Sequence, residues 1–440
     1  MTILAIPAIT AWRKGALRPL GADVLPALAF YLTMYQAPLR RLVFAGESLT
    51  SSEITVLDMA LYCSAGVSCI VSLRPGAFVA RRATPVPLGD LTIQEARIEA
   101  YAGFGAILLG FAFFAIWVAS AGLSNVLSAS LGDIYLTNAG DGARTTATFQ
   151  WPLVVGGVGA ITHAFARWPG RGPATRLWVP YAIAIVCYAI INARLGARGP
   201  TLELFVAIYL IRAETRRPVS RRGLLAFAAA FGFFFFFVSV MRQNLDEGLA
   251  GASGEKVSAE AEGTLTGENA TEFDVIFDNH VMVTQLAGTK VPYLEGDSWT
   301  SVPMQLIPRQ IMKNKPTQLS VWFIDYIDHQ TARKGGGRAF GSFAEGYLNF
   351  GVPGAAAQVV AITMLLLALL PLLRAKAVGV APAAAALLAF GYHSHRSELL
   401  VVAFTTRNAA IVATVTFVIA WILAQILKQP EHDTGAATVS

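Results

Sequence analysis

Hydrophobic residues in this chain gather in long runs that short polar segments separate. A membrane-spanning helix needs about 20 mainly apolar residues, and several of these runs approach or exceed that length. Strands of a membrane barrel would alternate between apolar and polar residues instead. The pattern therefore predicts ten membrane helices, at roughly residues 20–36, 54–73, 99–121, 149–166, 176–193, 200–213, 222–241, 350–373, 379–402 and 408–427.

The composition agrees with an all-α polytopic membrane protein. Of the 440 residues, 55% are hydrophobic and 14% are charged, whereas about 25% of residues in an average soluble domain are charged. The three cysteines, Cys63, Cys69 and Cys187, lie inside apolar runs and are interpreted as core residues rather than a disulfide framework. The net charge of +6 reflects topology-fixing lysines and arginines, and we expect no nucleic-acid partner.

Basic residues are concentrated in alternate loops, and short basic loops stay on the cytoplasmic side of a membrane. This rule places both termini in the cytoplasm, and it places residues 122–148 and 242–349 outside, in a periplasm. Arg40 and Arg41 are a weak exception. The residues that set the orientation are Arg74, Arg81, Arg82, Arg97, Arg167, Arg171, Arg176, Arg212, Arg216, Arg217, Arg221, Arg222, Arg374 and Lys376.

The predicted helices divide the chain into four parts. Residues 1–241 carry helices one to seven, and residues 242–349 form a large periplasmic loop. Residues 350–428 carry helices eight to ten, and residues 429–440 form a polar cytoplasmic tail. Within the large loop, residues 248–271 have the composition of a mobile segment. The remainder is rich in aromatic residues, which favours packing onto the membrane helices.

Cationic side chains gather on the predicted outer face. Arg198 precedes Gly199 and Pro200, a pair that opens a helix, and a helix N-terminus favours anions. Guanidinium groups also bind diphosphates in a bidentate manner. We therefore interpret this set as a candidate diphosphate site, although such arginines also contact lipid headgroups: Arg198, Arg309, Lys315, Arg144, Arg338 and Arg407.

Glu345 lies close to the predicted membrane boundary, where an unpaired carboxylate is costly. Two interpretations remain open: a general base for a sugar hydroxyl, or a structural ion pair with Arg338 or Arg309. Asn349 lies four residues further on, and so on the same helical face, where a structural and a catalytic role are both open.

A second polar group, His393, His395, Arg396 and Glu398, falls within the predicted ninth helix, and ionisable residues inside a membrane are functional candidates. Two histidines without further His or Cys ligands nearby do not predict a metal site. We find no Asp-x-Asp pair on the cytoplasmic side and no Walker loop. The sequence therefore predicts neither a metal nor another cofactor.

The stretch Glu345-Gly-Tyr-Leu-Asn-Phe-Gly-Val-Pro-Gly354 resembles the Glu-x-Tyr-x-Asn-Phe-Gly-x-x-Gly motif of bacterial oligosaccharide repeat-unit polymerases, the O-antigen polymerase (Wzy-type) family. Upstream, Ile307-Pro-Arg and Lys315-Pro316 resemble that family's Pro-Arg…Lys-Pro element, and Gly296-Asp-Ser298 resembles the Gly-x-Ser before it. Gly196-Ala-Arg-Gly199 is similar to the family's Gly-Ser-Arg-Gly segment, with Ala in place of Ser.

The resemblance implies a membrane glycosyltransferase with a GT-C-like architecture in the bacterial inner membrane. The donor and the acceptor would both be oligosaccharides linked to undecaprenyl diphosphate, and the site would be periplasmic. Glu345 would be the catalytic base, while Ser298, Tyr347 and Asn349 would bind or support the glycan. Chain-length regulators and flippases would be partner proteins, besides the membrane lipid.

Two other functions compete with this interpretation. An O-antigen ligase would use the same chemistry with a lipid A core acceptor, but the family's His-Asn-type signature is replaced here by Phe340. A flippase or another transporter of lipid-linked oligosaccharides would place polar residues near the middle of the membrane, whereas this sequence gathers its charges at the predicted outer boundary.

Overall fold

We analysed a computed structural model of the chain. It describes residues 25–73, 91–122, 141–169, 175–194, 198–215, 272–307, 318–327, 340–375, 377–396 and 398–427, together with the single positions 173, 229, 255, 258, 259, 263, 312, 316 and 329. Within these ranges every regular element is helical, and the only extended pairing described is an isolated bridge between Ala287 and Val291.

The described helices follow one another in the order α2 (Leu25–Met34), α3 (Gln36–Val43), α4 (Ser51–Leu73), α5 (Ile93–Ala121), α8 (Asp141–Ala166), α9 (Thr175–Arg194), α10 (Arg198–Thr215), α13 (Glu272–Leu286), α14 (Asp297–Leu306), α15 (Leu319–Ile327), α17 (Ser342–Leu369), η2 (Leu370–Arg374), α18 (Val380–Ser394) and α19 (Leu399–Ile426).

Five segments are long and apolar enough to cross a membrane: Ser51–Val71, Ile93–Ser120, Arg176–Ala193, Ser342–Leu373 and Leu399–Ile426. They overlap the predicted second, third, fifth, eighth and tenth spans. The predicted fourth and ninth spans overlap the shorter apolar helices Trp151–Ala166 and Val380–Ala389. The predicted seventh span lies outside the described residues, apart from residue 229. The expectation of an all-helical membrane protein is thus supported.

Small residues let the helices approach closely. Gly103 of α5 and Gly157 of α8 face each other, and a Cβ atom on either would collide with the carbonyl oxygen of the other. Such glycine contacts are typical of helix pairs in membranes, where van der Waals packing is a main attraction between helices. The preceding residue of α8, Gly156, lies against Val412 of α19. The three helices α5, α8 and α19 therefore pack tightly together.

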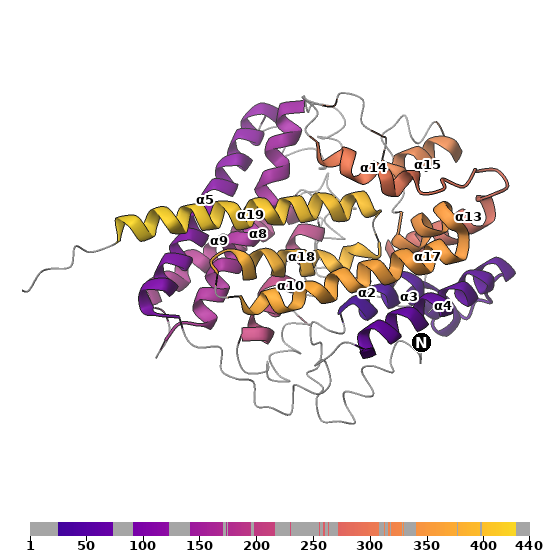
Figure 1. Cartoon of the computed structure of the whole chain (residues 1–440), viewed down its shortest axis with the longest axis horizontal. Coiled ribbons are helices and arrows are strands. Elements are labelled where there is room, and N and C mark those ends of the chain that lie inside the picture. The colour runs from indigo at the N-terminus through magenta and orange to yellow at the C-terminus, as the bar shows by residue number, and fades with distance from the viewer. Residues whose placement is uncertain are drawn as a thin grey trace, which may run out of the picture.

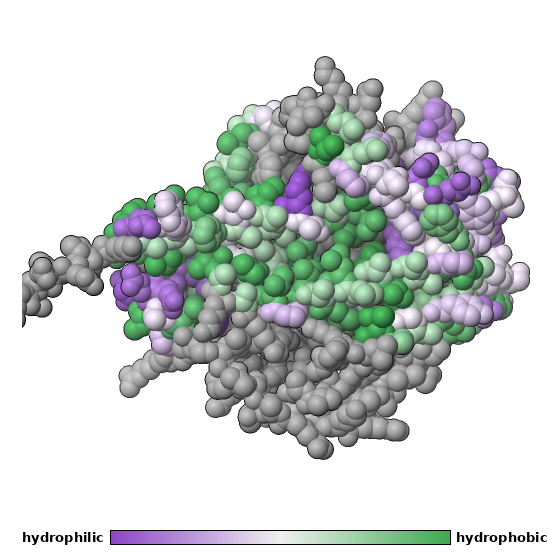
Figure 2. Space-filling model, in the orientation of Figure 1, coloured by the Kyte–Doolittle hydropathy of each residue, from purple (hydrophilic) through white to green (hydrophobic). Residues whose placement is uncertain are grey.

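Polar residues lie mainly at the two ends of the described structure. Figure 1 shows α13, α14 and α15 gathered at one end, near the start of α17, with the C-terminal end of α19 opposite. In Figure 2 the middle of the same face is mostly hydrophobic, and hydrophilic residues gather at both ends, more extensively around α13, α14 and α15. This distribution is typical of a membrane protein whose helices run between two polar surfaces.

Two of the predicted boundaries that differ from the structure change the position of a candidate arginine. The break that we expected between residues 402 and 408 lies between Ser394 and Leu399, so that Arg407 is inside α19 rather than between two helices. Helix α8 begins at Asp141, so that Arg144 is helical rather than part of an outer loop. In both places the helical backbone continues through polar residues, which hydropathy alone interprets as a loop.

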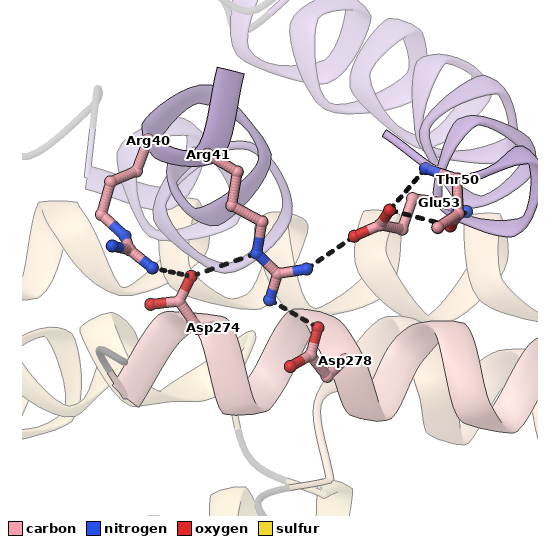
Figure 3. Close-up of polar contacts among 6 residues, drawn as sticks. All are labelled: Arg40, Arg41, Thr50, Glu53, Asp274 and Asp278. Carbon is pink, nitrogen blue, oxygen red and sulfur yellow. Dashed lines mark hydrogen bonds and ion pairs between the residues drawn. The ribbon is translucent and has the colours of Figure 1, made fainter. Parts of the chain in front are cut away.

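Arg40 and Arg41, the exception to the predicted charge bias, are paired with carboxylates (Figure 3). Arg40 lies 2.9 Å from Asp274 of α13. Arg41 lies 2.6 Å from Glu53 of α4 and 2.7 Å from Asp278 of α13. The network fastens α13 to the N-terminal helices α3 and α4.

Candidate functional site

The candidate site forms where α17 bends sharply. Phe350 (φ −141°, ψ 28°) and Gly351 (φ 63°, ψ −148°) are not helical, so they divide α17 into a short first segment, residues 342–349, and a long second segment, residues 352–369. The side chain of Gln358 nevertheless donates a hydrogen bond to Glu345. In a straight helix these residues would lie about 20 Å apart, so the two segments fold back on each other.

The glycines of the motif make this bend possible. The backbone of Gly351 lies in a region that glycine occupies almost exclusively. Gly346 and Gly354 lie in the two segments at their contact, where a Cβ atom on either would collide with the carbonyl oxygen of the other. Gly354 therefore has a packing role. The helix begins at Ser342 rather than near residue 349, but the predicted span edge at 350 coincides with the bend.

Residues 294–299, which we call the strap, cover the first segment of α17. The N–H of Leu294 donates to the carbonyl oxygen of Leu348 (3.0 Å), and the N–H of Gly296 donates to the Oδ1 atom of Asn349 (3.0 Å). Gly296 adopts a φ of 97°, which leads the strap into α14. The strap thereby places Ser298 and Trp299 over Glu345.

Glu345 is buried, with 1% of its surface exposed. Ser298 donates its hydroxyl to Oε1 (2.8 Å), while the Gln358 side-chain amide and the N–H of Leu399 (2.6 Å) both donate to Oε2. The described partners of this carboxylate are thus neutral groups. The proposed structural ion pairs involve Arg309 and Arg338, which lie outside the described residues.

The directions of the hydrogen bonds identify Glu345 as an acceptor on both oxygens. Trp299 has an indole N–H that can only donate, and its bond to Oε1 of Gln358 (2.8 Å) turns the Gln358 amino group towards Glu345. In the same way, the Gly296 N–H fixes the orientation of Asn349, whose amino group donates to Ser298 Oγ (2.8 Å). The network therefore favours an ionised Glu345, the form that accepts a proton.

A second buried carboxylate, Glu398, precedes Leu399 at the start of α19. The N–H of Ser320 in α15 donates to its Oε2 atom (3.2 Å). Burial, reinforced by repulsion from Glu345, raises the pKa of Glu398 to about 7. Two acidic groups with such different surroundings can divide the roles of proton acceptor and proton holder.

Two buried histidines lie beside the first segment of α17. His395 Nδ1 is 3.0 Å from the hydroxyl of Ser342, and the ring of His280 contacts Phe343 (ring centroids 5.3 Å apart). Burial lowers the pKa of His280 and of His395 to about 3, so both are neutral near pH 7. The described residues contain no group of three or more His, Cys, Asp or Glu side chains that can hold a metal ion.

The structure brings together three of the predicted site residues: Ser298, Glu345 and Asn349 are joined by hydrogen bonds. Asn349 also donates to the carbonyl oxygen of Glu345 (2.8 Å), as expected for residues on one helical face. Tyr347 lies in the same segment but contacts Phe343 and Tyr293. It therefore lies away from the hydrogen-bond network around the carboxylate.

Of the six cationic side chains predicted to bind a diphosphate, the structure describes only that of Arg407. Arg407 lies in α19, with its guanidinium 5.0 Å from the ring of Phe404 and bonded to Asn408 (3.2 Å). Arg198 begins α10, which confirms the predicted helix start, and Arg144 lies in α8; the structure describes neither side chain. Arg309, Lys315 and Arg338 lie outside the described residues.

Two members of the hydrogen-bond network around Glu345 were not predicted: Gln358, which donates to Glu345, and Trp299, which donates to Gln358. Gln358 had a signal, because a glutamine inside the apolar run 355–373 costs energy unless it is hydrogen-bonded. Nothing in the sequence indicated the hydrogen bond of Trp299, since an aromatic residue in a polar segment fits a packing role equally well. Both partners depend on the bend at Gly351, which brings residues far apart in the sequence into contact.

Fold and site together define an all-helical protein with membrane-spanning segments and a buried carboxylate at a helix bend. Comparisons with family models, curated proteins and solved structures gave no match, so they assign the chain to no family.

Proposed function

We propose that the protein is a membrane glycosyltransferase that polymerises oligosaccharide repeat units carried on undecaprenyl diphosphate. The observation that carries the proposal is Glu345, a buried carboxylate to which every described side-chain and backbone partner donates. Such a group suits the removal of a proton from a sugar hydroxyl. The motif around Glu345 supports the same conclusion through its resemblance to repeat-unit polymerases.

In the proposed reaction, a hydroxyl oxygen of the acceptor glycan attacks the anomeric carbon of the donor. The bond from that carbon to the phosphate oxygen breaks, and the lipid diphosphate leaves with the electron pair. Glu345 takes the hydroxyl proton. Its Oε2 atom already accepts two hydrogen bonds and its Oε1 atom accepts one, from Ser298. The acceptor hydroxyl therefore binds at the remaining acceptor position of Oε1. Because Glu345 is buried beneath Ser298, this requires the strap to move.

Arginines are proposed to stabilise the leaving diphosphate in place of a metal. Arg407 is the described candidate. Side chains of a helix point towards its N-terminus, so Arg407 points along α19 towards Leu399, which binds Glu345. Its described partners are neutral. Arg198, Arg309, Lys315, Arg338 and Arg144 complete the proposed cationic set. The proposal includes ten spans, a GT-C-like arrangement, cytoplasmic termini and a periplasmic site.

Deletion of the gene in the native host, followed by gel analysis of surface glycans, tests this function. A polymer ladder that collapses to a single repeat unit supports a polymerase. Loss of even the single repeat indicates a flippase or a ligase and contradicts the proposal. Complementation with wild type, Glu345→Gln and Glu295→Gln sharpens the test, because Glu295 is an exposed carboxylate on the same strap. We expect only Glu345→Gln to fail.

A further inference from the structure

Glu345 and Glu398 are two buried acids that interact electrostatically, so the protonation of one depends on the other. Glu345 and Glu398 are 1% and 3% exposed, and Leu399, which directly follows Glu398, donates its N–H to Glu345. Repulsion from the carboxyl group of Glu345 contributes to the raised pKa of Glu398. Because two buried like charges cannot both form without a large cost, the pair favours a single negative charge, with the other carboxyl group protonated.

Hydrogen-bond directions assign this proton. If Glu345 carried it on Oε2, the proton would displace the Gln358 or the Leu399 donor. If Glu345 carried it on Oε1, the Ser298 hydroxyl would have to accept from Glu345 as well as from Asn349, and its own proton would lose its described acceptor. If Glu398 carries it, only the Ser320 hydroxyl has to rotate, which lies 3.4 Å from Oε1 of Glu398 and can accept as readily as donate. The second arrangement keeps every described donor to Glu345.

Helix α19 favours the same assignment. Its first N–H groups form a positive helix end, and the N–H of Leu399 points at Glu345, while the side chain of Glu398 makes no capping bond to its own helix. Burial and repulsion from Glu345 raise the pKa of Glu398 to about 7, even though the N–H groups of Ser320 and Leu319 oppose the shift.

The other charged or titratable groups near Glu398 do not hold the proton instead. In the turn before α19, His395 is neutral because burial lowers its pKa to about 3, and Arg396 is a permanent cation. Asp325 of α15 and His329, which follows that helix, bind each other at the exposed surface. On α10, Glu203 is a further acid nearby, but it interacts with Arg396 and does not contribute to the pKa shift of Glu398. Among the groups that act on Glu398 directly, the proton therefore belongs to one of the two glutamates.

We infer that Glu398 holds the proton of a carboxylic acid–carboxylate pair and acts as the positioning residue that keeps Glu345 the anion of that pair. Ionisation of Glu398 as the pH rises through about 7 places a second charge beside Glu345. The effect of Glu398 on catalysis rests on the proposed function. The assignment of the proton to Glu398 does not depend on that function.

Infrared difference spectroscopy of the purified full-length protein tests the assignment, because a protonated carboxyl group has a C=O band that an ionised one lacks. Wild type is expected to show a band that disappears as the pH rises through about 7. Glu398→Gln should lack this band. Glu345→Gln should keep it, but lose it at a lower pH because the repulsion is gone. Ser320→Ala should keep it at a shifted frequency, since the hydroxyl beside Oε1 is removed.

A band that survives in Glu398→Gln and vanishes in Glu345→Gln would place the proton on Glu345 and overturn the inference. A wild-type spectrum without a carboxyl band that titrates near neutrality would also overturn the inference. If Glu398→Gln does not fold, an unshifted band in Ser320→Ala would overturn it instead. Polymer formation is measured on the same samples. An intact titration without glycosyl transfer would reject the proposed function alone, and transfer without the titration would reject this inference alone.

Thermal unfolding gives an independent check. The pKa of Glu398 is raised from 4.5 to about 7, so the folded state binds more protons and loses stability as the pH rises between these values. Glu398→Gln cannot ionise. Its melting temperature relative to wild type should therefore be higher at pH 8 than at pH 5, by several degrees. An equal difference at both pH values would contradict the assignment.

Discussion

Gln358 donates a hydrogen bond to the carboxylate of Glu345 across 13 residues of what is otherwise one helix. The bend at Phe350 and Gly351 makes this contact possible, and it turns the start of α17 back against the rest of the same helix. The site therefore depends on a backbone conformation as much as on the chemistry of its side chains.

Substitutions at Gly351 test this dependence. With φ 63° and ψ −148°, the residue is strained by any side chain, although nothing crowds a Cβ atom there. We expect Gly351→Ala and Gly351→Asn each to destabilise the protein by about 1–3 kcal/mol and to abolish polymer formation. Thermal unfolding and a polymerisation assay measure both effects.

Gly46 provides the control for this prediction. It has a similar φ of 66°, also without crowding, but lies in the exposed segment between α3 and α4 and is not part of the Glu345 network. Gly46→Ala should lower stability without a comparable loss of transfer. Equal losses of transfer in the two variants would mean that strain alone, and not the position of Glu345, determines activity.

Glu345→Gln tests the catalytic base. The replacement can still accept from Gln358 and Leu399, but its amino group forces the Ser298 hydroxyl to find another partner. We expect a modest loss of stability, about 1 kcal/mol, and a fall in transfer rate of about 10²- to 10⁴-fold. Glu295→Gln should change neither quantity. Full activity of a well-folded Glu345→Gln protein would exclude Glu345 as the base.

Much of the site was predictable because its motif is local. Glu345 and Asn349 are four residues apart, and helical periodicity alone places them on one face. The positions of Ser298 and Gln358 were not predictable in this way, because the first depends on the strap and the second on the bend. Hydropathy located the long apolar helices, but it placed the end of α18 and the start of α19 too far along the chain. Its windows do not recognise the polar turn at residues 395–398 or the continuation of α19 through Arg407.

The network around Arg41 predicts unequal effects of removing its members. Arg41→Met leaves Glu53 and Asp278 without this cation, and Glu53 is largely buried. We expect a loss of about 2–4 kcal/mol. Asp278→Asn removes a carboxylate with 47% of its side chain exposed, and should cost less than about 1 kcal/mol. Unfolding measured at low and high salt checks both values. Equal losses would show that α13 is held mainly by apolar packing.

Arg407→Lys tests the proposed diphosphate site. Arg407 is half-buried in a membrane-spanning helix, and its described contacts are the ring of Phe404 and the side chain of Asn408. A lysine keeps the positive charge but cannot bind two phosphate oxygens as a planar fork. Because a charged hydrogen bond contributes about 1.5–3 kcal/mol, affinity for the lipid diphosphate should fall at least about tenfold. The fall should appear in equilibrium binding as well as in transfer.

The matched control is Arg212→Lys, because Arg212 is an exposed arginine near the end of α10. We expect this variant to bind the lipid diphosphate normally. Unchanged binding by Arg407→Lys would remove Arg407 from the diphosphate site, and the undescribed side chains of Arg198 and Arg309 would then be the next to test.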